Sequence, residues 1–486
     1  MDQHLGEYLG IEADWSLEGD DAHAVEVISP HTEQPIARVV AAGPAEVDAA
    51  VAAARAAIDH GPWPRLDPAE RIAAVRRLAE IYAGRRGEMA QLISAEMGAP
   101  ISFAQRAQVG LPAMMMSAFC DLAETHPWHE TRTGFFGSDV RIQKQPVGVV
   151  AAIVPWNMPQ FLIVTKLVPA LLAGCAVVLK PAPESPLDAA LLSDMLKEVG
   201  LPDDVVSVIQ GDAGVGARLV GHPGVDKVSF TGSSAAGRAV AAAAAANLTK
   251  VSLELGGKSA AIILDDADPD TVAAGVRSAS LSNSGQICNA LTRIVVPAAR
   301  EREYVDALAD RMNALIVGDP ADPATELGPL VSRRQQQRVR DYIDLGRNEG
   351  ARMVCGGTDL PDGVDSGWYV RPTLFAGADN SMRIAREEIF GPVLTVIGYR
   401  NEDEAIAIAN DSDYGLAGSV WTADTDRGIS VAERVQTGTF GVNQGYTMDP
   451  FAPFGGIKDS GYGRELGREG LEGYLETKSI AVATAR

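Results

Sequence analysis

Short hydrophobic runs alternate with segments of helical periodicity in the middle of the chain. The hydrophobic runs lie at residues 147–154, 175–180, 205–210, 227–231 and 251–255. Segments with apolar residues at helical spacing lie between them, at 160–173, 185–199, 213–221 and 234–247. Strands that are apolar along their whole length belong to parallel sheets with helices on both faces. The pattern therefore predicts an α/β fold whose ligands bind beyond the carboxyl ends of the strands.

The flanking regions predict further helices and strands. Residues 47–125 have mostly helical periodicity, and residues 131–145 have the pattern of a hairpin around a Gly-containing turn. In the tail, residues 478–485 alternate apolar and small side chains, which indicates an edge strand. A second α/β region extends from about 256 to 450, with strand candidates at 260–264, 293–297 and 393–399.

Size and charge narrow the class of protein. The chain has 486 residues, which is enough for more than one domain. Hydrophobic residues make up 46% of the chain and charged residues 22%, as in ordinary globular proteins. A formal net charge of −22 repels phosphate backbones and anionic bilayers, so we expect neither a nucleic-acid nor a membrane partner.

Neither a secretion signal nor a membrane span is predicted. Residues 1–18 lack the basic start and apolar run of a signal peptide, and prolines and polar residues interrupt the longest apolar region, 147–179. The four cysteines are scattered without a CxxC pair. That distribution suits a reducing cytosol and argues against a disulfide framework or a structural zinc site. We therefore expect a cytoplasmic protein without a bound metal.

Cys288 is the first candidate for chemistry. A free cysteine is most often a small buried hydrophobe, and Cys175, inside the apolar run 175–180, fits that description. Cys288 lies in the segment SGQICN, where glycine and polar residues flank it, so it need not occupy a dry core. It is therefore the cysteine best placed to act as a nucleophile.

Two polar residues follow predicted strands. Glu254, in LELGGK, ends the run 251–255, where a buried carboxylate is costly unless it has a task or a partner. A salt bridge to Lys258 is the structural alternative. Asn157, in PWNMP, follows the first strand, and its amide is a plausible donor to a developing oxyanion. A turn-forming asparagine is the alternative there.

The next strand ends carry candidate cofactor contacts. Gly232 and Ser233 lie at a strand–turn–helix junction, where helix capping and free N–H groups suit a phosphate. Lys180 ends the second strand, where it either reaches the cofactor or is a solvated strand terminus. The GxGxxG fingerprint of ordinary Rossmann dehydrogenases is absent from the sequence.

Together these motifs resemble those of the aldehyde dehydrogenase superfamily, in the family's order and from about residue 15 to the C-terminus. The matching segments are PWNMP at 155–159, KPAPE at 180–184, FTGS at 230–233, LELGGK at 253–258, GQICNA at 285–290, EEIFGPV at 387–393, FGVNQG at 440–445, PFGGIKDSG at 453–461 and GRELG at 463–467. Each segment alone is a weak signal, but the ordered set is highly specific.

The resemblance implies an enzyme that oxidises an aldehyde to a carboxylic acid with NAD(P)+. It implies Cys288 as the nucleophile that forms a thioester, Glu254 as the base for hydrolysis, and Asn157 with the Cys288 backbone N–H as the oxyanion hole. It also implies a proton-relay role for Glu465. It implies that Lys180, Gly232 and Ser233 contact the adenosine and pyrophosphate part of the cofactor, with Trp156 near the pyrophosphate. Leu255, Glu388 and Phe390 are implied at the nicotinamide end.

Cofactor choice is affected by one departure from the family pattern. Many NAD-preferring members carry a glutamate three residues after the lysine, where it binds the ribose 2′-hydroxyl. Pro183 occupies that position here, and Glu184 comes one residue later. A proline does not repel a 2′-phosphate, so NAD is the first expectation and NADP is allowed as an alternative.

The substrate is indicated only by class. Positions that line the family's access tunnel correspond to Met158, Leu162, Thr165, Ile287, Asn289, Met448 and Phe454. Most are apolar, and no arginine or lysine stands among them to hold a second carboxylate. Medium aliphatic, terpenoid or aromatic aldehydes therefore fit better than succinic semialdehyde-like substrates.

The resemblance also implies a division of the chain. Residues 1–125 and 146–255 are expected to form a Rossmann-like NAD(P)-binding domain, and residues 256–469 an α/β catalytic domain. Residues 126–145 and 470–486 are expected to form a small β bridging element, which in the family extends a sheet across a subunit boundary. We therefore expect a homodimer or a homotetramer.

Three other functions remain to be separated. A CoA-acylating relative would form the same thioester but usually lacks the glutamate base. A non-enzymatic relative would be expected to have lost Cys288, Glu254 or Asn157. An esterase that uses the same thiol would not need the cofactor motifs. NADH absorbance after NAD and an aldehyde are added separates all three.

Overall fold

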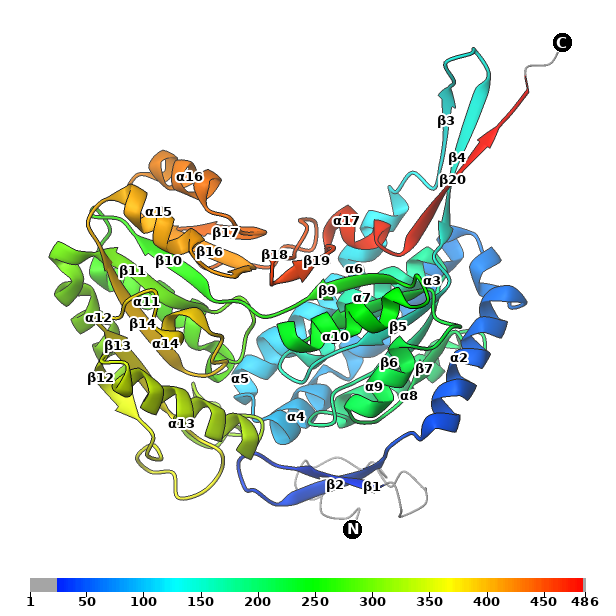
Figure 1. Ribbon diagram of the computed structural model, residues 1–486. Helices are drawn as coiled ribbons and strands as arrows, with labels where there is room; N and C mark the ends of the chain where they lie inside the picture. The colour runs from blue at the N-terminus through cyan, green and yellow to red at the C-terminus, as the bar shows by residue number, and fades with distance from the viewer. Residues whose placement is uncertain (1–23, 484–486) are drawn as a thin grey trace.

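The computed structural model describes residues 24–483. The predictions for residues 1–18 and for the last residues of the tail lie outside this range. Two α/β lobes stand side by side, and a narrow arm projects from one of them (Figure 1). No helix among the described residues is both long enough and apolar enough to cross a bilayer.

The first lobe is built on the predicted parallel sheet, which is confirmed. Its spatial order is β19-β9-β8-β5-β6-β7. The five parallel strands are β5 (Val149–Ile153), β6 (Ala176–Lys180), β7 (Val206–Val208), β8 (Lys227–Thr231) and β9 (Lys250–Glu254). The sixth, β19 (Gly461–Tyr462), pairs antiparallel with β9, so a segment far along the chain completes this sheet.

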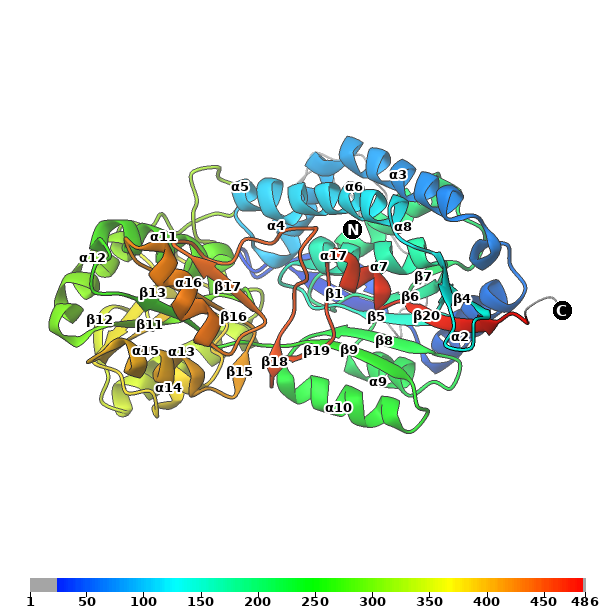
Figure 2. The ribbon, with the colours of Figure 1, turned by 90° about the horizontal axis from the view of Figure 1, so that it is seen from above.

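Helices cover both faces of this sheet, as the apolar strands require (Figure 2). Along β5, Val150 and Ala152 enter the core on one face, while Val149 and Ala151 enter the core on the other. One face is covered by α3 (Pro68–Gly84), α6 (Gly110–Glu124), α7 (Pro159–Ala173) and α8 (Leu187–Val199), and the other by α2 (Pro44–Asp59), α9 (Ala213–Val220) and α10 (Ser234–Ala245). Each buried valine stabilises the fold by about 1.5–3 kcal/mol.

Local signals set the helix ends. Asp67 caps α3 by accepting a hydrogen bond from the Ala69 N–H at 3.0 Å, and Glu70 reaches back to the Asp67 N–H at 2.9 Å. Pro68 occupies the first helical position. This reciprocal pair with a leading proline is a strong start signal, which is why the helix begins at Pro68.

Strand order creates a switch point between β5 and β8. The chain proceeds from β5 to β6 and β7 on one side, and then places β8 and β9 on the other side. Ligands of open α/β sheets bind beyond the carboxyl ends of the strands at such a reversal. The segments that follow β5 and β8 are Pro155–Asn157 and Gly232–Ser233, so the sequence motifs flank this switch point.

The second lobe contains a seven-stranded sheet, in the order β12-β13-β14-β11-β10-β16-β17. The strands are β10 (Ser259–Ile263), β11 (Leu291–Pro297), β12 (Arg352–Gly357), β13 (Arg371–Ala376), β14 (Val393–Tyr399), β16 (Ala417–Trp421) and β17 (Thr439–Val442). Only β12, at one edge, runs antiparallel to its neighbour. The strands predicted at 260–264, 293–297 and 393–399 are confirmed as β10, β11 and β14.

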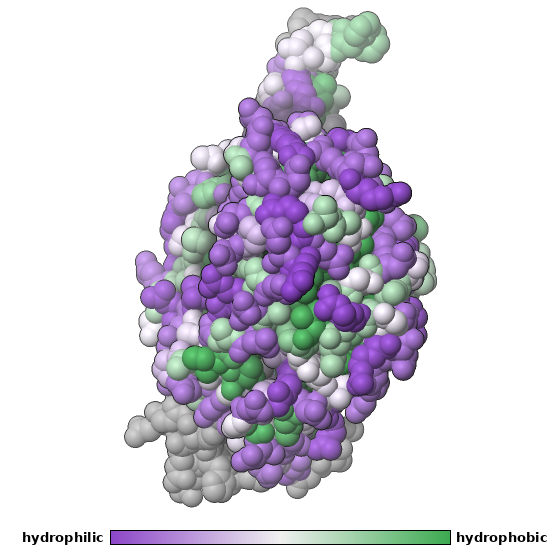
Figure 3. Space-filling view, turned by 90° about the vertical axis from the view of Figure 1, so that its left-hand side faces the viewer, coloured by the Kyte–Doolittle hydropathy of each residue, from purple (hydrophilic) through white to green (hydrophobic). Residues whose placement is uncertain are grey.

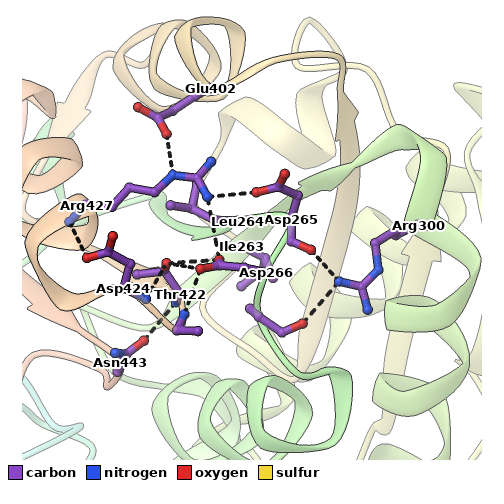
Figure 4. Close-up of polar contacts among 12 residues, drawn as sticks. Ile263, Leu264, Asp265, Asp266, Arg300, Glu402, Thr422, Asp424, Arg427 and Asn443 are labelled. Atoms are coloured by element: carbon purple, nitrogen blue, oxygen red, sulfur yellow. Dashed lines mark hydrogen bonds and ion pairs between the residues drawn. The ribbon is translucent and has the colours of Figure 1, made fainter.

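The switch point of this second sheet, between β10 and β16, is filled by the protein's own polar side chains (Figure 4). Asp266 accepts hydrogen bonds from the Thr422 hydroxyl at 2.9 and 2.8 Å and from the Ala423 N–H at 3.1 Å. Arg427 joins Asp265 at 2.8 Å to Glu402 at 2.9 Å. Because these groups satisfy one another, the ligand crevice is to be sought at the first sheet.

The arm is the third sheet, in the order β20-β4-β3. It contains β3 (His129–Thr133), β4 (Asp139–Pro146) and β20 (Leu475–Ala481). The predicted hairpin and the predicted tail strand therefore pair with each other, with β20 at one edge. The arm is hydrophobic at its tip (Figure 3), where the turn between β3 and β4 carries Phe135 and Phe136, 96% and 93% exposed.

Several features have no counterpart among the predictions, strands β12, β13, β16 and β17 of the second sheet among them. Strands β1 (Ala24–Ile28) and β2 (Pro35–Val40) form a separate antiparallel hairpin. Within the helical region, η3 (Ala104–Gln108) is a π-helical turn between α5 (Ile101–Phe103) and α6. A π turn inserts one residue into the helical repeat, and the 3.6-residue pattern does not indicate where it occurs.

Candidate active site

The Cys288 thiol lies in the loop between η4 (Ser282–Gly285) and β11. Three consecutive residues of η4 have left-handed backbone angles: Asn283 with φ 53°, Ser284 with φ 57° and Gly285 with φ 73°. A side chain at Gly285 would collide with the Gly391 carbonyl, so glycine is required there. Non-glycine residues in this conformation store strain, and such strain clusters at functional sites.

The half-buried thiol borders an apolar cluster. The sequence-predicted tunnel residues Met158, Leu162, Met448 and Phe454 belong to that cluster. Ile287 and Asn289 flank the thiol in the chain and are half-buried. Four of the seven proposed tunnel residues therefore belong to, or pack against, the same apolar cluster as Cys288.

Glu254 ends β9 with a buried side chain. Neither of its carboxylate oxygens has a hydrogen-bond partner among the described residues. The alternative of a salt bridge to Lys258 is wrong, because the Lys258 ammonium is also buried without a hydrogen-bond partner among them. Gly455 provides the room for the carboxylate, since a Cβ there would lie 2.6 Å from Glu254 Oε1.

Electrostatics link the thiol and the carboxylate. Burial raises the pKa of the Cys288 thiol to about 12, and the nearby charges of Glu388, Glu254 and Glu465 act in the same direction. Burial, with the charge of Glu465, raises the pKa of Glu254 well above its usual range. A thiol that holds its proton needs a base, and a carboxylate of raised pKa is a stronger base than an ordinary one.

Asn157 is held between the two loops that meet at the thiol. Its side-chain amide donates to the Gln286 carbonyl at 2.9 Å, two residues before Cys288. Its own carbonyl accepts hydrogen bonds from Gln108 and from Asn283, both at 2.8 Å. One N–H of the Asn157 amide is thus used in the loop, and the other makes no hydrogen bond among the described residues.

Glu465 belongs to a buried polar group next to Glu254. It forms an ion pair with Lys166 and accepts a hydrogen bond from the Thr165 hydroxyl at 3.0 Å. Lys166 also donates to the Thr231 hydroxyl at 2.7 Å. Thr165, predicted as a tunnel residue, is instead directed to this carboxylate. Glu465 therefore has an ion-pair partner and a hydrogen-bond donor, whereas Glu254 has neither among the described residues.

The other cysteines do not share this environment. Cys120 and Cys175 are buried, and burial raises the pKa of Cys120 to about 12 and of Cys175 to about 11. Cys355 lies in β12, where burial raises its pKa. No buried carboxylate without a partner among the described residues accompanies them. Cys288 remains the candidate nucleophile.

One side of the switch point carries the residues predicted for the adenosine end of a dinucleotide. Lys180 ends β6, and burial lowers its pKa to about 8 although Glu184 opposes that change. Ser233 is the N-cap of α10 and accepts a hydrogen bond from the Ala236 N–H at 3.3 Å. Gly232 precedes it, and the first turn of the helix has N–H groups without intrahelical partners.

The opposite side carries the residues predicted for the nicotinamide end. Glu388 is half-buried and accepts a hydrogen bond from the Gly257 N–H at 3.0 Å. Burial raises its pKa to about 7. Phe390 and Trp156 meet edge to face, with ring centroids 5.4 Å apart, so loops from the two lobes touch here. Leu255 is buried one residue after Glu254.

Comparison with known proteins decides the family. A model of the aldehyde dehydrogenase family matches residues 16–480. The chain belongs to the aldehyde dehydrogenase family. Among curated relatives it is 46% identical to geranial dehydrogenase of Castellaniella defragrans over 454 residues, which is 93% of this chain and 94% of that protein. It is 42% identical to a 3-succinoylsemialdehyde-pyridine dehydrogenase of a Pseudomonas species over 97% of both chains.

Solved structures of the aldehyde dehydrogenase family agree with this fold. An aldehyde dehydrogenase of Mycobacterium tuberculosis in complex with NAD+ is 47% identical, with a TM-score of 0.94 and coverage of 96% of both chains. Aldehyde dehydrogenase C of Pseudomonas syringae, with one cysteine replaced by alanine and in complex with NAD+ and octanal, is 44% identical. Its TM-score is 0.91, and the match covers 96% of this chain and 94% of that one.

Sequence reasoning missed several residues at the site of this aldehyde dehydrogenase. Tyr446 packs against the cluster beside Cys288, and its ring lies 6.1 Å from that of Phe454. Lys166 lies on α7, where its buried position could have been inferred only from the apolar residues around it. Gln108 contacts the Asn157 carbonyl from the π turn, and no motif indicates this contact.

Proposed function

We propose that this member of the aldehyde dehydrogenase family oxidises a medium-sized apolar aldehyde to the carboxylic acid with NAD+, through a thioester on Cys288. The observation that carries the proposal is the pairing of a thiol of raised pKa with Glu254, whose buried carboxylate has no hydrogen-bond partner among the described residues. This arrangement lies beside the switch point of a sheet that carries cofactor motifs.

The first half of the mechanism uses three groups of this chain. The Cys288 thiol releases its proton to water, and the thiolate sulfur forms a bond to the aldehyde carbon. The carbonyl electron pair moves to oxygen, where the free N–H of the Asn157 amide and the Cys288 backbone N–H stabilise the alkoxide. A nicotinamide dinucleotide, when bound, would supply the hydride acceptor needed for oxidation of the thiohemiacetal to the thioester.

The second half is hydrolysis. Glu254 accepts a proton from water, and the resulting hydroxide attacks the thioester carbon. The bond from carbon to sulfur breaks, and the acid leaves. The raised pKa of Glu254 favours proton transfer from water in this step. We propose that Glu465, paired with Lys166, then receives the proton and passes it away from the site.

The residues present fit a nicotinamide dinucleotide. The start of α10 offers free N–H groups next to Gly232, and the positive end of a helix favours a pyrophosphate. Lys180 and Ser233 would hold the adenosine and pyrophosphate part, with Trp156 near the pyrophosphate, while Leu255, Glu388 and Phe390 would hold the nicotinamide part. The structures of relatives with bound NAD+ support NAD as the cofactor of this chain.

The substrate class follows from the apolar lining of the thiol. Met158, Leu162, Met448 and Phe454 offer no charge to a substrate. Geranial, which appears in the name of one relative, and octanal, which is bound in the structure of another, have the same character and support this choice. The test is a panel of aldehydes ranked by kcat/KM with NAD and NADP in parallel. Octanal or geranial should lead the panel, and succinic semialdehyde should be poor. Absence of NADH formation with every aldehyde would refute the proposal.

Replacing Pro183 with glutamate is expected to lower NADP use more than NAD use. Pro183 is half-buried in the turn after β6, three residues from Lys180. Two like charges about 4 Å apart repel by about 1–4 kcal/mol, so the NADP/NAD ratio of kcat/KM should fall about tenfold or more. Pro202→Glu, a half-buried proline before β7, is the matched control. An unchanged or higher ratio in Pro183→Glu would place Pro183 away from the ribose.

We propose that the arm makes this protein a homodimer or homotetramer. The β3 edge of the arm and the exposed rings of Phe135 and Phe136 would be covered by a second copy. Light scattering at micromolar concentration should give a mass of two or four chains. Phe135→Ser with Phe136→Ser should shift the mass toward one chain. A monomer mass for the unmodified protein would contradict the proposal.

The domain assignment completes the proposal. Residues 1–125 and 146–255 would bind the cofactor, residues 256–469 would carry catalysis, and residues 126–145 with 470–486 would bridge subunits. The pairing of β19 with β9 adds a strand from the catalytic segment to the cofactor-binding sheet. The four unpaired cysteines support a cytoplasmic location.

A further inference from the structure

We infer that Gln108 is a positioning residue that aligns the Asn157 amide with the Cys288 thiol. The inference rests on the proposed function, because it assigns a task to the support of the oxyanion hole. Gln108 is fully buried at the end of the π turn η3, and its side-chain N–H lies 2.8 Å from the Asn157 carbonyl oxygen. Asn157 is 49 positions further along the chain.

The orientation of the Gln108 amide is set by its neighbours. The nitrogen faces two acceptors, the Asn157 carbonyl at 2.8 Å and the Met97 sulfur at 3.5 Å. Its oxygen has no hydrogen-bond partner among the described residues. A reversed amide would place its oxygen against another carbonyl oxygen, which is repulsive. Gln108 therefore acts at this position as a donor to the Asn157 carbonyl.

A second side-chain amide, in the loop that precedes Cys288, donates a hydrogen bond to the same Asn157 carbonyl. Asn283 donates to the Asn157 oxygen at 2.8 Å from a left-handed backbone conformation. Gln286 joins the group, because its side-chain oxygen accepts from the Val331 N–H at 3.0 Å and its nitrogen donates to the Asn283 carbonyl at 3.1 Å. The Asn157 side chain closes the ring through the Gln286 carbonyl at 2.9 Å.

A buried carbonyl such as that of Asn157 does not need two hydrogen-bond donors. A single donor removes most of the cost of burying a carbonyl group. Here two side chains from separate elements converge on one oxygen, and one of them is held in a strained conformation. Two donors fix the plane of the peptide group as well as its position. That plane sets the direction of the Asn157 side chain, whose free N–H is the proposed oxyanion donor.

The π turn explains how Gln108 reaches this place. The extra residue of a π turn changes which side chains face inward, and such turns are frequent at functional sites. Ala104 and Gln108 are the buried residues of η3, while Gln105 and Arg106 are exposed. The Gln108 side chain thereby points toward Asn157, just before the start of α7.

The test compares Gln108→Met with a matched control, Gln336→Met. Methionine has a similar volume and cannot donate a hydrogen bond. Gln336 is also a buried glutamine that donates to a backbone carbonyl, that of Tyr369 at 2.9 Å. We expect Gln108→Met to slow first-turnover NADH formation by about 10- to 100-fold, somewhat below the ~10²–10³-fold cost of losing a direct oxyanion donor. KM for NAD should stay within about twofold, because the cofactor contacts are separate.

A double-mutant cycle separates positioning from general loosening. In an Asn157→Ala background, Gln108→Met should cause no further slowing, because its effect passes through Asn157. Equal slowing in both backgrounds, or a Gln108→Met rate equal to that of Gln336→Met, would overturn the inference. A full rate in Asn157→Ala alone would instead remove Asn157 from the proposed mechanism, and the inference with it.

Asn283→Gly provides the second variant. Glycine accepts the left-handed conformation, so the change removes the amide donor without adding backbone strain. It should slow first-turnover NADH formation to a similar extent. In the Asn157→Ala background it should cause no further slowing. If Gln108→Met does not fold, Asn283→Gly tests the inference in its place. A normal first-turnover rate in Asn283→Gly would show that two donors to the Asn157 carbonyl are not needed, and would overturn the inference.

Discussion

Cys288→Ala is expected to abolish NADH formation, the first turnover included. The thiol supplies the only covalent bond between the enzyme and the aldehyde in the proposed mechanism, so no thiohemiacetal forms without it. The change removes one sulfur atom from a half-buried loop and should leave the cofactor contacts in place. Rapid-mixing absorbance at high enzyme concentration, with NAD titration by fluorescence, measures both effects.

Cys355→Ala is the control for Cys288→Ala. Cys355 is half-buried in the edge strand β12 and its thiol pKa is also raised, but it lies outside the cluster around Cys288. Its activity should equal that of the unmodified enzyme. Intact-protein mass spectrometry should detect an acyl adduct on the unmodified enzyme and on Cys355→Ala but not on Cys288→Ala. A normal burst in Cys288→Ala would remove the thiol and the central proposal.

The parallel sheet and the site around it could be predicted because both follow from local patterns. Fully apolar runs between helical segments specify a covered parallel sheet. The carboxyl ends of its strands then gather Asn157, Lys180, Ser233 and Glu254 at one edge, whatever the details of packing. The order of the family motifs allowed Cys288 to be predicted as a further site residue, although it lies in the second lobe.

The interactions that tune the site could not be predicted, because they depend on three-dimensional neighbours. A salt bridge between Glu254 and Lys258, four residues apart, was a reasonable alternative from sequence. In the structure both are buried without a hydrogen-bond partner among the described residues, and burial lowers the pKa of Lys258 to about 7. Gln108 was missed for a related reason, since the π turn that directs it inward breaks the helical periodicity.

Glu254→Gln is expected to separate hydride transfer from hydrolysis. Glutamine is close in size but cannot accept a proton, so the acyl-enzyme should form and then stall. Loss of a positioned general base typically costs ~10²–10⁴-fold, which corresponds to about 3–5 kcal/mol of barrier. Steady turnover should fall by that factor while a burst of about one NADH per site persists. Rapid-mixing absorbance measures the burst, and mass spectrometry measures the acyl adduct.

A buried carboxyl outside the site serves as the control for Glu254→Gln. Glu96 accepts hydrogen bonds from the Leu187 and Asp188 N–H groups at 2.8 and 3.0 Å, so its oxygens have structural partners that those of Glu254 lack. Glu96→Gln should lower the melting temperature without changing the ratio of burst to steady turnover. Full steady-state activity in Glu254→Gln would remove Glu254 from the mechanism.

The pH dependence of hydrolysis provides an independent test of Glu254 as the base. The ionised form of Glu254 is the base, and its pKa is raised, so the active fraction grows as the pH rises. Hydrolysis of a preformed acyl-enzyme should therefore accelerate with pH in the unmodified protein and lose this dependence in Glu254→Gln. The thiol titrates only when it is free, so an acylated Cys288 contributes nothing to this profile. A burst that also slows in Glu254→Gln would mean that the same carboxylate also deprotonates the thiol.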